Sequence, residues 1–140
     1  MNELKSKTTP NDVVLILLSG HGSLEGFQFA DGVVRYSRIN ETLNGLKYKV
    51  MIIHSNACNA SIAQPRYMSG KNRIFTNPGF EFPSMFPEYM KEADLYGNKD
   101  GYCSLKEAMV FWRDEKHPEN IFYDPYNISG KFYWKEEYLK

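Results

Sequence analysis

Six consecutive apolar residues run into a histidine between two glycines in the segment Val13-Val14-Leu15-Ile16-Leu17-Leu18-Ser19-Gly20-His21-Gly22. A segment that is apolar at every position, rather than at every second one, is typical of a strand buried on both faces of a parallel sheet. A second apolar segment, Val50–His54, leads into Ser55-Asn56-Ala57-Cys58. Two such strands, joined by a connection long enough for a helix, predict an α/β fold with a mostly parallel sheet.

The rest of the chain predicts the other elements of a single domain, residues 1–140. Residues 1–12 are polar and end in a turn. An Asp31-Gly32 turn predicts a β-hairpin within residues 26–36, and a helix is expected from about residue 37 to just before Gly45. Further along we expect one helical turn over 60–64 that Pro65 ends, a strand over 72–76, a helix over 86–93, and a helix from the capping box of Ser104 and Glu107 through Trp112.

The composition excludes several classes of protein. With 42% hydrophobic and 24% charged residues, the chain is globular rather than intrinsically disordered. Lys plus Arg number 17, as do Asp plus Glu, so the net charge is zero and no basic face predicts nucleic-acid binding. The longest purely apolar run, Val13–Leu18, is far shorter than the ~20 residues of a membrane span. No charged-then-apolar leader opens the chain, so we expect a cytoplasmic protein by default.

Each apolar strand ends near a residue that could carry acid–base or nucleophilic chemistry, His21 and Cys58. Because α/β sheets place their sites at the carboxyl ends of strands, parallel neighbours would bring these two to one edge. The imidazole could then take the thiol proton, and the N–H groups of Gly22 and Cys58 could hold an oxyanion. Either residue alone fits simple packing better, but the pair, flanked by small residues, favours a catalytic dyad.

The remaining histidine and cysteine are predicted to be structural. Cys58 and Cys103 are the only cysteines, too few for a disulfide scaffold, so reduced thiols are expected. Cys103 takes a place usually held by an apolar residue and is predicted to be packed. His54 lies within the second strand, which favours a core residue over a second base. Three histidines without a cysteine or carboxylate at ligand spacing predict no zinc site.

Together, the segment Val13–Gly22 and the segment Val50-Met51-Ile52-Ile53-His54-Ser55-Asn56-Ala57-Cys58-Asn59-Ala60-Ser61 resemble the legumain-like cysteine peptidases. This group includes the catalytic subunit of the glycosylphosphatidylinositol transamidase and is related to caspases. The resemblance covers residues 11–65 and is looser over 66–140. It implies a caspase-like three-layer α/β/α fold, a catalytic dyad of His21 and Cys58, oxyanion donors at Gly22 and Cys58, a peptide or protein substrate and no cofactor.

The chain departs from this family pattern at two places. Relatives often carry an acidic residue two positions before the cysteine, which in legumain helps line the substrate pocket; here the position is Asn56, the candidate pocket residue. The family domain also has two strands before the histidine-bearing strand, whereas 12 residues precede Val13. The resemblance therefore implies a copy that lacks the first two strands.

Two functions follow from these observations. The first is a cysteine endopeptidase or transpeptidase. The second is an inactive remnant of the same fold that serves as an interaction module. Since an uncovered apolar strand promotes association, we also expect self-association, or a partner segment, to cover Val13–Leu18.

Residues 96–107 match part of an EF-hand calcium loop. The weak calcium candidates are Asn98, Asp100, Ser104 and Glu107. Tyr96 stands at the first ligand position and supplies no carboxylate. A turn at Asp100-Gly101 followed by a helix cap is therefore the stronger interpretation, and no metal site is predicted.

Overall fold

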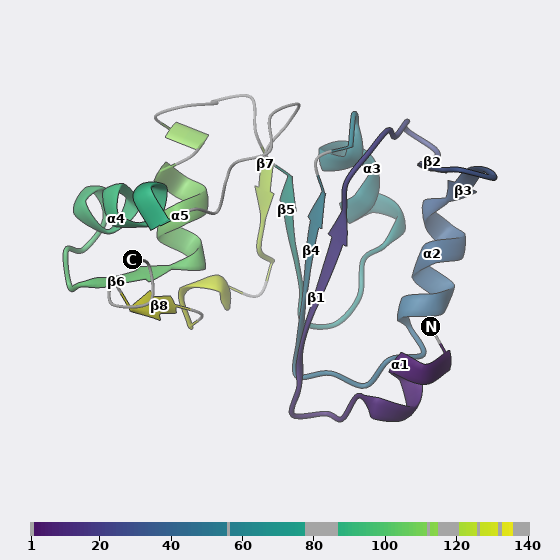
Figure 1. The fold of residues 1–140 in the computed structure, drawn as a ribbon, viewed down its shortest axis with the longest axis horizontal. Coiled ribbons are helices and arrows are strands. Elements are labelled where there is room, and N and C mark those ends of the chain that lie inside the picture. Colours follow the sequence, from purple (N-terminus) through teal and green to yellow (C-terminus); the bar gives the residue numbers. More distant parts are fainter. Residues whose placement is uncertain are drawn as a thin grey trace.

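The computed structural model describes residues 2–55, 57–77, 87–111, 113–114, 121–125, 127–131 and 133–135. A four-stranded sheet lies at its centre, with helices beside it (Figure 1). In chain order the elements are α1 (Asn2–Lys7), β1 (Val13–Leu18), β2 (Gly26–Phe29), β3 (Gly32–Arg35), α2 (Tyr36–Leu43), β4 (Val50–Ser55), α3 (Ala60–Tyr67), β5 (Arg73–Asn77), α4 (Pro87–Tyr96), β6 (Tyr102–Ser104), α5 (Leu105–Phe111), β7 (Ile121–Tyr123), the 3₁₀-helix η2 (Ser129–Lys131) and β8 (Tyr133–Lys135).

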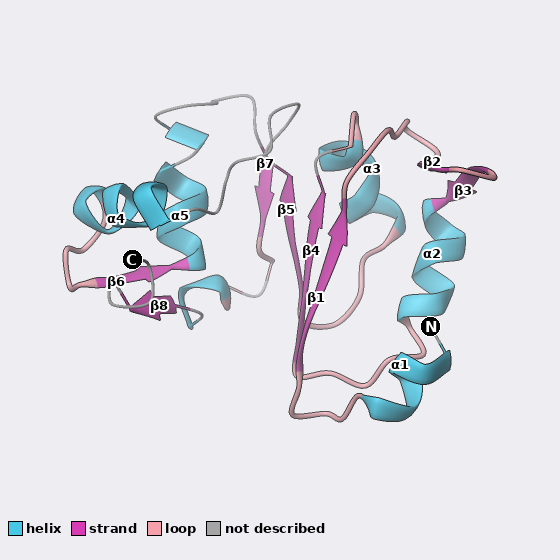
Figure 2. Ribbon diagram, viewed as in Figure 1, coloured by secondary structure: helices cyan, strands magenta, loops and turns pink. Residues whose placement is uncertain are grey.

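The central sheet has the strand order β1-β4-β5-β7. β1, β4 and β5 run parallel, and β7 pairs with β5 in the antiparallel direction (Figure 2). The prediction of an α/β fold with a mostly parallel sheet is confirmed. The register of β1 on β4 is continuous from Val13 opposite Val50 to Leu18 opposite Ser55.

Among the described strands, β1 lies at the edge of the sheet, with β4 as its one neighbour. The expectation that β1 is buried on both faces was therefore wrong. Val14 is buried, whereas Leu15 is 49% and Leu17 is 58% exposed. Burial on both faces instead occurs in β4, in which every residue from Val50 to Ser55 is buried, because β4 has a strand on each side and a core cluster on each face.

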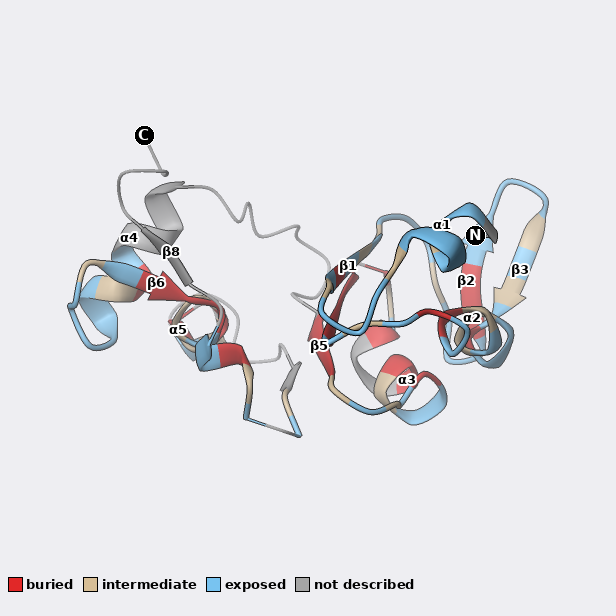
Figure 3. Cartoon of the chain, turned by 90° about the horizontal axis from the view of Figure 1, so that it is seen from below, coloured by how far each residue is buried: buried red, intermediate tan, exposed pale blue. Residues whose placement is uncertain are grey.

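The buried residues form two core clusters, one on each face of the sheet. Figure 3 colours the buried parts of the chain red, among them parts of β5, β6 and α3. On one face, Met51 and Ile53 of β4 pack with α2 and α3. On the other face, Val50 and Ile52 pack with Leu105 of α5. Helices thus contribute to the core on both faces, which is the layered arrangement expected of an α/β domain.

Arg73, at the start of β5, joins several elements at the end of the sheet opposite the candidate site. Its side chain is 1% exposed and donates to Asn40 Oδ1 (2.5 Å), Asn44 Oδ1 (2.9 Å), Tyr48 Oη (2.9 Å) and the carbonyl oxygen of Met68 (2.6 Å). Because all these acceptors are neutral, hydrogen bonds rather than an ion pair compensate the buried charge. The guanidinium therefore ties α2 and the end of α3 to the sheet.

The hairpin and the helices differ in detail from the predictions. The hairpin is present as β2 and β3, with Gly26 opposite Arg35, and its two-residue loop is Ala30-Asp31 rather than Asp31-Gly32. α2 begins one residue before the predicted start. α4 ends three residues after the predicted end of its helix, while residue 86 lies outside the described residues. α5 is described to Phe111, so the predicted extension through Trp112 lies outside the described residues.

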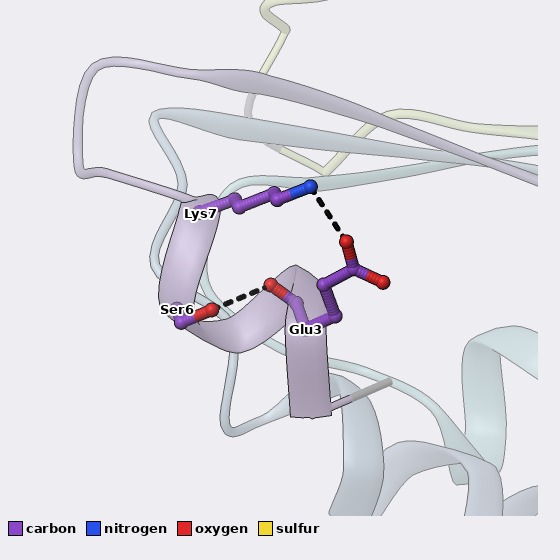
Figure 4. A network of polar contacts seen from close by, with 3 residues as sticks. All are labelled: Glu3, Ser6 and Lys7. Carbon is purple, nitrogen blue, oxygen red and sulfur yellow. Dashed lines mark hydrogen bonds and ion pairs between the residues drawn. The ribbon is translucent and has the colours of Figure 1, made fainter.

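Two helical predictions need correction. Pro65 does not end α3, which continues to Tyr67, because a proline deletes one helical hydrogen bond while Ala63, Gln64 and Met68 remain buried against the core. The polar N-terminus contains the unpredicted helix α1. In α1 the Lys7 ammonium lies 2.6 Å from a Glu3 carboxylate oxygen, and Ser6 Oγ donates to the Glu3 carbonyl over 2.8 Å (Figure 4).

Candidate functional site

The register of β1 on β4 sets the positions of His21 and Cys58. Leu18 and Ser55 are partners at the carboxyl ends of the two parallel strands. His21 follows Leu18 by three residues, and Cys58 follows Ser55 by three residues. Both therefore extend beyond the same edge of the sheet from adjacent strands, as predicted from the sequence. The His21 side chain is exposed, while Cys58 is partly buried.

Gly22 brings the loop after β1, which carries His21, into contact with the turn after β4, which carries Cys58 (the cysteine turn). A Cβ atom at this position would lie 2.8 Å from Ala57 Cβ and 3.1 Å from the Cys58 carbonyl oxygen. Distances this short leave no room for a side chain, so the two loops meet backbone to backbone. Gly20, with φ +146°, supplies the left-handed turn that leads the chain out of β1 toward this contact.

The N–H group of Gly22 remains available for a ligand. Gly22 and Phe27 form an isolated antiparallel bridge, in which His21 O accepts from Gln28 N (2.8 Å) and Ser23 N donates to Gly26 O (2.9 Å). These two bonds flank Gly22 and do not use its own N–H. Within the described part of the chain, neither the Gly22 N–H nor the Cys58 N–H has a hydrogen-bond partner.

Cys58 lies in a tight turn between β4 and α3. Ala57 N donates to Ser55 Oγ (3.3 Å), and Ala60 N donates to the Ala57 carbonyl (3.2 Å). Asn59, at φ 58°, adopts the left-handed conformation that asparagine tolerates better than most residues. This turn places Cys58 two residues before the first turn of α3, whose N–H groups favour a nearby negative charge.

The two cysteines lie in different environments. Cys103, in β6, is 2% exposed and buried as predicted. Burial, with added repulsion from Glu107 and Asp94, raises the pKa of Cys103 to about 12. A thiol in that environment is neutral at physiological pH and unreactive. Cys58 is the more accessible of the two, at the sheet edge.

The sequence analysis missed Tyr36, whose hydroxyl lies beside the contact of Gly22 with the Cys58 turn, and Gln64, which interacts with that hydroxyl. Tyr36 is the first residue of α2 and Gln64 lies in α3; both side chains are fully buried. The Tyr36 hydroxyl lies 2.9 Å from where a Cβ on Gly22 would stand. Nothing in the local sequence distinguishes either residue, because only the packing of α2 and α3 against the sheet brings them to the site.

His54 lies in the core, as predicted. It is 2% exposed, and its Nδ1 is 2.7 Å from Thr76 Oγ1 on β5. Burial lowers the pKa of His54. The candidate pocket residue Asn56 lies outside the described residues.

The weak calcium candidates lie close together, around a polar cavity of about 640 Å³ between β6, the start of α5 and Gly130. Their carboxylates accept hydrogen bonds from the loop itself: Asp100 Oδ1 from Tyr102 N (2.9 Å), and Glu107 Oε2 from Ser104 N (2.9 Å). In return, Ser104 Oγ accepts from Glu107 N (3.1 Å), so the predicted capping box is confirmed.

The described residues contain no group of three or more His, Cys, Asp or Glu side chains arranged to hold a metal ion. Nor does any helix in the described ranges have the length and apolar character needed to cross a membrane. Comparison with known protein families and with curated proteins finds no match for this chain.

Proposed function

We propose that this chain is a cysteine peptidase or transpeptidase that uses His21 and Cys58 as its catalytic dyad. The observation that carries the proposal is the register of β1 on β4. It extends both residues from the same sheet edge, each three positions beyond a paired strand end. The contact of Gly22 with the Cys58 turn supports the same pairing.

In the proposed reaction, His21 takes the Cys58 proton and Sγ attacks the carbonyl carbon of the scissile bond. The N–H groups of Gly22 and Cys58, which have no hydrogen-bond partner among the described residues, stabilise the oxyanion of the tetrahedral intermediate. The protonated His21 then gives its proton to the leaving amine, which departs and leaves a thioester on Cys58. Water completes hydrolysis of the thioester, whereas a second amine completes transpeptidation.

The sheet order and the position of the dyad also support a caspase-like fold as the finer description of this α/β domain. The His-bearing strand β1 lies next to the Cys-bearing strand β4, with β5 beyond it. The first two strands that the family resemblance implies would pair with the open side of β1. That edge has no strand paired to it among the described residues.

Brief alkylation followed by mass spectrometry tests the dyad without knowledge of the substrate. With iodoacetamide at pH 6, we expect Cys58 to be labelled much faster than Cys103, because a buried thiol with a pKa of about 12 supplies almost no thiolate. His21→Ala should slow the labelling of Cys58 and leave Cys103 unaffected. Equal labelling of the two thiols, or no effect of His21→Ala, would contradict the proposal.

A peptide library tests turnover directly. Hydrolysis or aminolysis should be lost in Cys58→Ala and retained in Cys103→Ala, with circular dichroism used to verify that both variants fold. Activity that survives Cys58→Ala would refute the assigned nucleophile. Fast labelling of Cys58 without turnover of any peptide would favour the inactive interaction module instead.

A further inference from the structure

Two buried side chains that can donate hydrogen bonds lie near the candidate site: Tyr36, beside the contact of Gly22 with the Cys58 turn, and Gln64, next to Tyr36. The side chains of Tyr36 and Gln64 are 0% and 1% exposed. In the described part of the chain, the Tyr36 hydroxyl and Gln64 Nε2 form no hydrogen bond of regular geometry. A buried polar atom without a partner is uncommon and unfavourable, so its retention needs an explanation.

The position of the Tyr36 hydroxyl points to the site. α2 begins directly after the hairpin, where Tyr36 N donates to the Glu25 carbonyl (3.1 Å) and anchors the start of the helix. A Cβ atom on Gly22 would lie 2.9 Å from the Tyr36 hydroxyl and 3.1 Å from the Cys58 carbonyl oxygen. The hydroxyl is therefore directed at the junction of the two loops that present His21 and Cys58.

Tyr36 interacts electrostatically with both Gln64 and Cys58. Burial raises the pKa of Tyr36, the Gln64 amide lowers it by donating toward the phenol oxygen, and negative charge on Cys58 raises it further. At neutral pH the tyrosine is protonated, and its O–H is a donor. The Gln64 amide thus faces the phenol oxygen, and the phenol O–H lies beside the contact of Gly22 with the Cys58 turn.

Among the described residues the Tyr36 hydroxyl has no acceptor in the resting site, and a thiolate on Cys58 supplies one. We propose that Tyr36 is a positioning residue for the proposed dyad, whose hydroxyl, held by Gln64, donates a hydrogen bond to the Cys58 thiolate when it forms. Donors that are prearranged for a charge need no reorganisation when it appears, and a chain of donors strengthens each bond. The role in catalysis rests on the proposed function, while the effect on the thiol can be measured by itself.

The rate of Cys58 alkylation as a function of pH tests the inference. In Tyr36→Phe, labelling at pH 6 should be about tenfold slower and its pH midpoint about one unit higher, since a hydrogen bond to a charged group is lost. The melting temperature should be unchanged or higher, because phenylalanine fills the same space without the unpartnered hydroxyl. Gln64→Met, which removes the second donor, should slow labelling to a smaller extent.

Tyr67→Phe is the matched control, because it removes an exposed hydroxyl from α3, the helix that carries Gln64. Its Cys58 labelling should follow the unmodified chain at every pH. Unchanged Cys58 labelling in Tyr36→Phe would overturn the inference, whether or not the melting temperature is lower. The Tyr36 hydroxyl would then have a structural role only. If Tyr36→Phe fails to fold, unchanged labelling in Gln64→Met overturns it.

Failure of the peptidase proposal is distinguishable from failure of this inference. Suppose that no peptide is turned over but Cys58 labelling is slower in Tyr36→Phe. The hydrogen bond from Tyr36 is then supported, and the peptidase proposal fails. Suppose instead that peptidase activity requires Cys58 but Cys58 labelling is unchanged in Tyr36→Phe. The peptidase proposal is then supported, and the positioning role of Tyr36 is excluded.

Discussion

The imidazole of His54 is packed in the sheet, with Nδ1 2.7 Å from Thr76 Oγ1 on the neighbouring strand. Since burial lowers the pKa of His54, the folded state resists a proton that the unfolded state accepts near pH 6.5. The contribution of His54 to the free energy of unfolding is therefore fully present above about pH 6.5. It falls as the pH decreases toward the lowered pKa of His54 in the folded state, by at most about 1.4 kcal/mol per pH unit.

His54→Asn should remove this contribution, because an asparagine can keep a hydrogen bond to Thr76 but does not titrate. We expect the free energy of unfolding of the original chain to decrease between pH 7.5 and 5.5 more steeply than that of the variant. Urea denaturation at several pH values measures the difference. Parallel pH profiles for the two proteins would show that His54 does not contribute.

The residue scale also shows where sequence reasoning reaches its limit. His21, Gly22 and Cys58 are recognisable because each follows an apolar strand and sits beside small residues, so local sequence predicted that they would share a sheet edge. No pattern in the neighbouring sequence distinguishes Tyr36 or Gln64. They reach the site through the packing of two helices onto the sheet, and long-range packing cannot be deduced from a window of neighbouring residues.

At the scale of elements, the start of α5 depends on more than a helix cap. Glu107 accepts from Ser104 N and Ser104 Oγ, and also from Asn98 N (3.1 Å) in the loop after α4. One carboxylate thus joins the end of α4, strand β6 and the first turn of α5. Loss of a cap alone costs about 1 kcal/mol, and the additional bond to Asn98 increases that cost.

We therefore expect Glu107→Ala to lower the free energy of unfolding by about 2 kcal/mol, as measured by thermal or chemical denaturation. Glu107→Gln, which keeps one acceptor oxygen, should recover part of the loss. Lys106→Ala, a change at an exposed neighbour, should stay within about 0.5 kcal/mol of the original chain. A Glu107→Ala variant as stable as Lys106→Ala would contradict the role of Glu107 in joining these elements.

Element boundaries followed the sequence where local chemistry dominates. The capping box, the hairpin and the strand β4, apolar from Val50 to Ile53, are determined by neighbouring residues, and all three are present. α3 differs because core contacts of Ala63, Gln64 and Met68 outweigh the hydrogen bond that Pro65 deletes. The strands β6, β7 and β8 were not predicted, because each is three residues long and is stabilised by a distant partner.

At the scale of the whole molecule, the open edge of the sheet is the feature with the clearest consequence. Val13, Leu15 and Leu17 of β1 are each about half exposed, on a strand whose outer backbone edge has no strand paired to it among the described residues. Such an edge is a template for strand addition. We expect the 140-residue chain to self-associate as its concentration increases, and sedimentation velocity measures this.

Leu15→Lys should reduce association without unfolding the domain, because a charge on an exposed edge position opposes strand addition. Leu95→Lys, which replaces an equally apolar and exposed leucine on α4, is the matched control and should associate like the original chain. A monomer at every concentration, or equal association of both variants, would contradict the expectation.

The sequence by itself determined the α/β class, the two long parallel strands and the placement of His21 and Cys58 beyond their ends. Each of these depends on residue pattern within a short segment. The tertiary structure alone decided that β1 is an edge strand among the described strands, that Arg73 joins α2 and α3 to the sheet, and that Tyr36, next to Gln64, lies beside the contact of Gly22 with the Cys58 turn. These features depend on which segments pair across the chain, and pairing is decided by the total burial and hydrogen bonding of the assembled core rather than by any local pattern.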